Sequence, residues 1–77
     1  MSEEERARMI GVRDGLAHAM LSANQIRGSI TGPRDNYLPP QRHTKKRAAV
    51  EARLRDIDEI RAAIQQKLDG VNAALAA

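Results

Sequence analysis

TGPRDNYLPPQRHTKKR, residues 31–47, decides the fold of this 77-residue chain, because it is the only stretch in which helical periodicity stops. It contains all three prolines and the only aromatic residue, Tyr37. Glycine suits the left-handed position that follows a helix, and proline cannot continue one, so Gly32 and Pro33 predict a helix end. The sequences on the two sides of this stretch therefore predict two helices joined by a bend.

The sequence before the bend predicts a helix over about residues 3–31. Ser2 and Glu5 form a capping box, in which the serine side chain satisfies a backbone N–H at the helix start. Apolar or small residues then recur in alternating steps of three and four, which places them on one side of the helix. This first apolar stripe consists of Met9, Val12, Leu16, Ala19, Ala23, Ile26 and Ile30.

Three glycines interrupt this helix, and each costs about 0.8–1 kcal/mol relative to alanine. They are Gly11, Gly15 and Gly28. Gly11 and Gly15 share a side of the helix away from the stripe. Two interpretations stay open: a groove where another backbone or a ligand approaches closely, or a locally weak helix for which packing compensates.

The sequence after the bend predicts a second helix over about residues 44–75, with Thr44 as its N-cap and Pro40 as a rival start. Its apolar residues recur with the same alternating steps. This second apolar stripe consists of Val50, Leu54, Ile57, Arg61, Ile64, Leu68, Val71 and Leu75. Arg61 is its only charged member.

A short bend, over about residues 32–43, makes the two helices antiparallel, so we predict an all-α fold, a helical hairpin in a single domain over residues 1–77. Matching Ile30 with Val50 places Arg27 close enough to Glu51 to pair. Arg61 then has two interpretations. Its guanidinium reaches solvent along its methylene groups, or it points, with His18 nearby, into a cavity between subunits and meets an anion or a partner's acid.

A chain of this length buries only about 60% of its unfolded surface, which leaves a marginal core. It has no cysteine, so disulfides and cysteine-based zinc sites are excluded, and its two histidines are far apart in sequence. We therefore expect self-association into a four-helix bundle or a larger ring of hairpins. The apolar residues outside the stripes predicted to mediate it are Ile10, Met20, Leu21 and Ile60.

Positive charge is concentrated in the bend. Residues 34–47 hold five basic residues and one acid, a charge of +4 in a chain whose net charge is +3. Cations beside the free N–H groups of a helix start form an anion site. We expect a phosphate-bearing ligand to bind Arg34, Arg42, His43, Lys45, Lys46 and Arg47. Tyr37 offers a surface on which a base can stack.

Two functions remain open. The first is a non-enzymatic, oligomeric binding protein that captures nucleic acid or a small nucleotide at the bend. The second is a structural hairpin that docks through its apolar faces into a virion, secretion or regulatory complex, with the bend against an acidic protein surface. The sequence contains no cysteine nucleophile, Walker-type loop or HExxH motif, so we expect neither catalysis nor a cofactor or metal.

A cytoplasmic or other intracellular setting is expected. No apolar run reaches the ~18–20 residues of a membrane span. The first residues, MSEEERAR, include no apolar segment of the kind that directs secretion.

Overall fold

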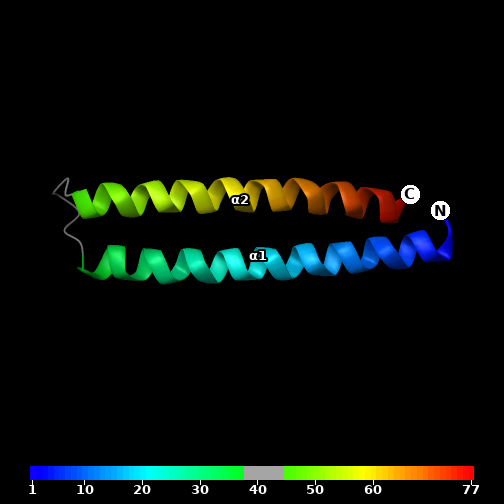
Figure 1. Cartoon of the computed structure of the whole chain (residues 1–77), viewed down its shortest axis with the longest axis horizontal. Coiled ribbons are helices and arrows are strands. Elements are labelled where there is room, and N and C mark those ends of the chain that lie inside the picture. Colours follow the sequence, from blue (N-terminus) through cyan, green and yellow to red (C-terminus); the bar gives the residue numbers. More distant parts are fainter. Residues whose placement is uncertain (38–44) are drawn as a thin grey trace.

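The computed structural model describes residues 1–37 and 45–77, including every side chain in these ranges except those of residues 35–37. The described chain forms two helices, α1 (Glu3–Tyr37) and α2 (Lys45–Ala76). They lie antiparallel and side by side, with both termini at the end opposite the connection (Figure 1). The molecule measures 57 × 15 × 14 Å. The predicted all-α helical hairpin is confirmed.

The start of α1 is formed as the capping box predicts. The backbone N–H of Glu5 donates to Ser2 Oγ at 3.1 Å, and the N–H of Arg6 donates to the Ser2 carbonyl at 2.9 Å. Three glutamates follow in the first turn, where the helix dipole favours negative charge. Ser2 Oγ therefore supplies an acceptor for one of the N–H groups that a helix start leaves without partners, and the Ser2 carbonyl accepts the first hydrogen bond of the helix itself.

The predicted end of the first helix at about residue 31 is wrong, because α1 continues through Gly32 and Pro33 to Tyr37. A residue before proline normally avoids helical geometry because its Cβ and N–H meet the proline ring, and Gly32 has no Cβ. Gly32 also keeps a negative φ, so it does not form the left-handed helix end expected of it. The added turns stay packed on α2 through Arg34, whose Nη1 donates to Glu51 Oε1 at 2.9 Å.

The second helix, predicted over 44–75, ends at Ala76, one residue beyond the predicted end, and its described part begins at Lys45. Its first turn contains no acidic residue. The two caps considered for it, Thr44 and Pro40, lie outside the described residues.

The side of α1 that faces α2 is rotated from the predicted stripe. Val12 and Ile26, two members of that stripe, are 51% and 52% exposed. Arg13, Met20 and Arg27, which lie outside it, are instead half-buried. The less exposed side of α1 includes Met9, Arg13, Leu16, Ala19, Met20, Ala23, Arg27, Ile30 and Arg34. One edge of the predicted stripe is left facing out of the hairpin.

The hairpin has a thin core. Among the described residues only Ala23 and Leu54 are buried, at 8% and 3% exposure. The chain exposes 5901 Å², whereas a compact monomer of 8.5 kDa exposes about 4,700 Å². Its radius of gyration is 17.3 Å, against about 11.5 Å for a compact domain of this length. Two helices side by side thus leave roughly 1,200 Å² more surface in water than a compact fold does.

Neither α1 nor α2 combines the length and the apolar character needed to cross a membrane, as far as the described residues extend.

Candidate functional site

One side of the hairpin, here called the polar flank, contains ion pairs that link the two helices. Arg27 and Arg34 lie seven residues apart on α1, and Glu51 and Asp58 lie seven apart on α2. Antiparallel packing brings Arg34 to Glu51 at 2.9 Å and Arg27 to Asp58 at 2.8 Å. The predicted pair of Arg27 with Glu51 is wrong, since each of the two residues pairs with a residue seven positions further along the other helix.

Arg61 belongs to the same polar flank. Its Nη1 donates to Asp58 Oδ1 at 3.0 Å, and its Nε donates to Asn24 Oδ1 at 2.7 Å. The guanidinium thus leaves the apolar stripe and finds both acceptors within its own chain. His18, named with Arg61 for a cavity between subunits, is exposed on α1.

The electrostatics of the polar flank favour an ionised Asp58. The hydrogen bond from Arg27 lowers the pKa of the Asp58 carboxyl below its usual value of 3.8, and the hydrogen bond from Arg61 acts in the same direction. Partial loss of hydration opposes these effects without reversing them. The two arginines therefore hold a negative charge on this flank at neutral pH.

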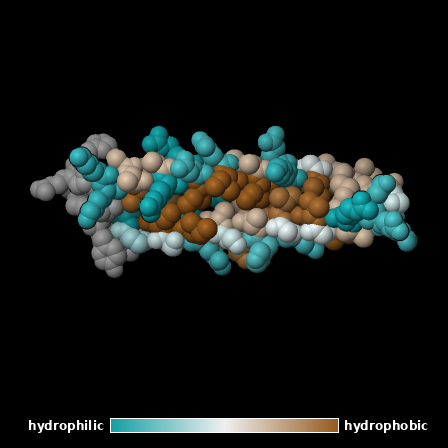
Figure 2. Space-filling model, in the orientation of Figure 1, coloured by the Kyte–Doolittle hydropathy of each residue, from teal (hydrophilic) through white to brown (hydrophobic). Residues whose placement is uncertain are grey.

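The opposite side of the hairpin, here called the open face, exposes apolar side chains. Val12, Ile26 and Ile60 are 51%, 52% and 54% exposed. The open face also includes two shallow grooves between the helices, one near each end of the hairpin. Figure 2 shows hydrophobic side chains as a band that follows the line between the helices. Such an apolar surface resembles the side of a helix that packs against another helix, but here no further helix of the described chain covers it.

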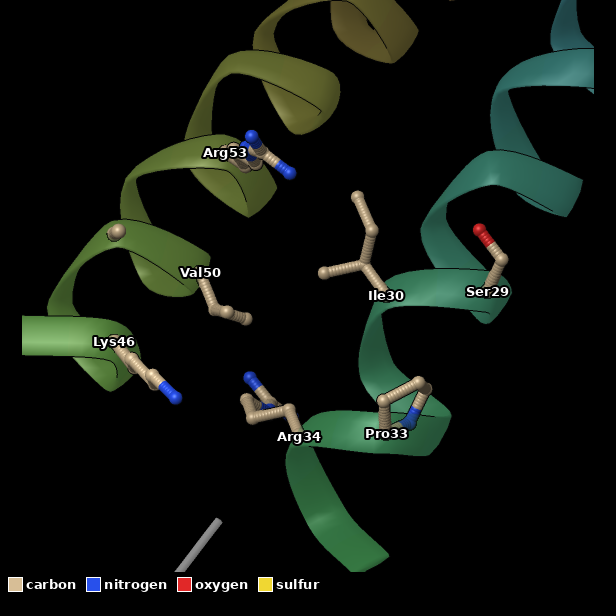
Figure 3. Close-up of a pocket in the computed structure, with 8 residues that line it drawn as sticks. Ser29, Ile30, Pro33, Arg34, Lys46, Val50 and Arg53 are labelled. Carbon is tan, nitrogen blue, oxygen red and sulfur yellow. The ribbon is translucent and has the colours of Figure 1, made fainter. Parts of the chain in front are cut away.

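The groove at the bend end of the open face has a volume of about 470 Å³. Ile30 of α1 and Val50 of α2 point toward one another across it (Figure 3). Three basic residues and no acidic residue line it: Arg34, Lys46 and Arg53. Since Arg34 is matched by Glu51, the net positive charge of this groove comes from Lys46 and Arg53.

The groove at the terminal end of the open face is lined by residues of both apolar stripes together with one cation and one glycine. Its volume is about 540 Å³. The lining residues are Met9, Val12, Leu16, Lys67, Gly70 and Val71.

The residues predicted to bind phosphate are only partly brought together. Arg34 and Lys46 line the bend-end groove. Lys45 is exposed and Arg47 is half-buried in the first turn of α2. Arg42 and His43 lie outside the described residues. So does the side chain of Tyr37, the predicted stacking surface.

Sequence reasoning missed Arg53, which lines the same groove. Arg53 follows Lys46 by seven residues, two helical turns, so both lie on one side of α2. This seven-residue spacing could have identified Arg53 as a neighbour of Lys46 from the sequence.

The residues predicted to mediate self-association do not share a face. Ile10 and Met20 are half-buried, and Met20 lines a hollow on the polar flank beside Arg61. Leu21 and Ile60 are 55% and 54% exposed, but only Ile60 lies on the open face. Val12 and Ile26, which do lie on it, were assigned from the sequence to the inside of the hairpin.

The described residues contain no group of three or more His, Asp or Glu side chains able to hold a metal ion. Neither a protein-family model nor any curated protein or solved structure matches the chain.

Proposed function

We propose that the chain is a self-associating helical hairpin that works as a protein–protein interaction module without catalytic activity. The observation that supports this proposal is the surface left outside the hairpin. Only two described side chains are buried, while Val12, Ile26 and Ile60 are more than half exposed along one face. Large apolar side chains gathered on one face are typical of an interaction surface.

The amount of surface is consistent with this proposal. A standard protein–protein interface buries about 800 Å² on each partner. The chain exposes roughly 1,200 Å² more than a compact monomer of its mass, so covering the open face against a partner brings it close to the normal range.

Dilution tests the proposal. Because folding and association are coupled in such a module, the thermal midpoint rises with protein concentration. We expect circular dichroism melts at 1 and 100 μM to differ in midpoint, and sedimentation equilibrium to give a mass above one chain. A cooperative melt that is independent of concentration, from a species with the mass of one chain, would contradict self-association.

Docking into a larger complex, such as a virion, secretion or regulatory assembly, would use the same open face. Purification of the chain from its native source distinguishes this role. A retained partner of different mass supports docking, whereas recovery of the chain with copies of itself alone supports pure self-association.

Capture of a phosphate-bearing ligand, either nucleic acid or a nucleotide, is a second candidate. The observation that favours it is the bend-end groove, which is lined by Arg34, Lys46 and Arg53 and by no carboxylate. The adjacent first turn of α2 also lacks acidic residues. Phosphate oxygens fit a groove whose polar side chains are cationic.

A matched pair of double variants tests phosphate capture. Lys46→Gln with Arg53→Gln removes the two cations, and Arg8→Gln with Arg55→Gln removes the same charge elsewhere. Binding of a mononucleotide and of a short single-stranded oligonucleotide is measured by anisotropy at 50 and 200 mM salt. We expect at least a tenfold loss in the groove variant alone and a steep salt dependence in the parent. Equal binding by both variants would exclude the groove.

A further inference from the structure

We infer that two copies of the chain pack through their open faces in opposite directions, so that the bend of one hairpin lies at the terminal end of the other. The product is an antiparallel four-helix bundle. This inference rests on the proposed self-association and adds to it the surface, the partner and the orientation.

Burial in an interface would cost free energy on the polar flank and would gain it on the open face. On the polar flank, Arg27 and Arg61 both already donate to Asp58, and covering these three residues would remove hydration from charged groups. On the open face, Ile26 and Ile60 gain from leaving water. Association therefore favours the open face.

The glycines near the open face are consistent with a close neighbour. A Cβ built on any of the five glycines meets nothing within 4 Å, so packing inside the hairpin requires none of them, Gly15 and Gly70 included. Gly15 lies one helical turn from Val12, and Gly70 lines the terminal-end groove. Absence of a side chain at these two positions leaves room for another helix to approach.

A second copy provides the charges that the open face needs. Lys46 and Arg53 line its bend end. Glu3, Glu4 and Glu5 form the first turn of α1 at the opposite end of the same molecule. Opposite-end packing brings these glutamates of one copy toward the cations of the other. Arg6, Arg8 and Lys67 of the terminal end reduce this attraction, so a second copy is favoured as the partner by the acidic first turn of α1 lying opposite Lys46 and Arg53.

The distribution of net charge points to the same orientation. Lys45, Lys46 and Arg47 form the first turn of α2 at the bend end, and that turn contains no acidic residue. Same-end packing would place two such turns side by side, where they repel. Opposite-end packing separates them by most of the 57 Å length of the hairpin, far beyond the Debye length of about 8 Å at physiological salt.

A matched pair of substitutions tests the surface. Ile26 and Leu21 are 52% and 55% exposed on the same helix, but their five-residue spacing turns them about 140° apart. Because a buried charge without a partner is costly, we expect Ile26→Asp to weaken dimerisation at least ~100-fold, and Leu21→Asp to change it less than ~3-fold. Sedimentation equilibrium measures both. A dimer that tolerates Ile26→Asp, or that Leu21→Asp disrupts, overturns the open-face assignment.

Spin labels test the orientation without disturbing the open face. The chain has no cysteine, so a single introduced cysteine labels one position in each copy. Lys45→Cys places the label at the bend end of α2, and Glu59→Cys places the matched label near its middle. In opposite-end packing, the middles of the two α2 helices lie at the same level of the bundle. The two backbones at Lys45→Cys are then about 45 Å apart along the bundle. The two backbones at Glu59→Cys are much closer together. Similar short distances at both positions would show same-end packing and overturn the inference.

The outcomes separate this inference from the proposed function. A chain that remains a single subunit at every concentration contradicts both. A dimer with the wrong surface or the wrong orientation contradicts the inference alone. If Ile26→Asp unfolds, the label distances in the otherwise unchanged chain still decide the orientation, and Ile60→Asp provides a second test of the surface from α2.

Discussion

Asp58 of α2 accepts a hydrogen bond from Arg27 of α1, with 2.8 Å between Oδ1 and Nε. The same oxygen accepts from Arg61 at 3.0 Å. One carboxylate oxygen thus joins a contact between the helices to a contact within α2. Because the Asp58 carboxylate loses its negative charge on protonation, the polar flank is sensitive to acid. The same charged group distinguishes the polar flank from the open face on the other side of the hairpin.

Acid is expected to weaken the fold through Asp58. Its pKa is lowered from 3.8, chiefly by the hydrogen bond from Arg27. A carboxyl whose pKa is lower in the folded state stabilises the fold above its unfolded pKa, and this contribution is lost as pH falls through the folded value. We expect the thermal midpoint to drop below pH 3.8, and to drop less in Asp58→Asn. Asp56→Asn, an exposed change on the same helix, is the control and should retain more of the acid sensitivity of the parent.

Pro33→Ala is expected to stabilise the chain. Pro33 lies inside α1, where it cannot donate to the carbonyl of Ser29. Alanine restores that donor, and an interior proline costs up to about 3 kcal/mol. Urea unfolding at fixed protein concentration measures the gain. No gain, or a loss, would indicate that α1 ends near Thr31 after all.

Two glycine substitutions separate helix propensity from association. A Cβ at Gly28 or at Gly15 meets nothing within 4 Å inside the hairpin. Gly28 shares its side of α1 with Leu21, so Gly28→Ala should raise stability by about 0.8–1 kcal/mol and leave the association constant unchanged. Gly15→Ala adds a methyl group beside the open face, so we expect it to weaken association in sedimentation equilibrium. Identical association by the two variants would remove Gly15 from the contact surface.

Ser2→Ala is expected to lower the free energy of unfolding by about 1 kcal/mol, because it removes the acceptor of the Glu5 N–H. Ser2→Asp retains an acceptor and should recover most of this loss. In hydrogen exchange, the loss should appear as faster exchange of the backbone amides near the start of α1. Equal stability of all three chains would show that the cap contributes nothing.

The pattern of apolar residues was sufficient to predict the hairpin. Steps of three and four on both sides of the bend specify two amphipathic helices, and the Ser2 capping box locates the start of α1. The end of α1 could not be predicted in the same way. Gly32 was interpreted as a helix terminator, but before Pro33 its missing Cβ removes part of the clash that would otherwise disfavour helical geometry.

The sides of the hairpin were harder to predict than its helices. Periodicity states which residues share a side of a helix, but not the angle at which that side meets its neighbour. The pairing of Arg27 with Asp58 accompanies a rotation of α1 that leaves Ile26 outside. Long arginine side chains can reach partners over several ångströms, so their choice of partner depends on the packed geometry rather than on spacing alone.

The unequal sides of the hairpin bear on how many chains can assemble. The polar flank is occupied by its own ion pairs, and the open face is the one long apolar surface among the described residues. A filament or an extended ring requires two different contact surfaces on every subunit. A subunit with a single such surface is saturated after one pairing, so growth should stop at a particle of fixed, small stoichiometry.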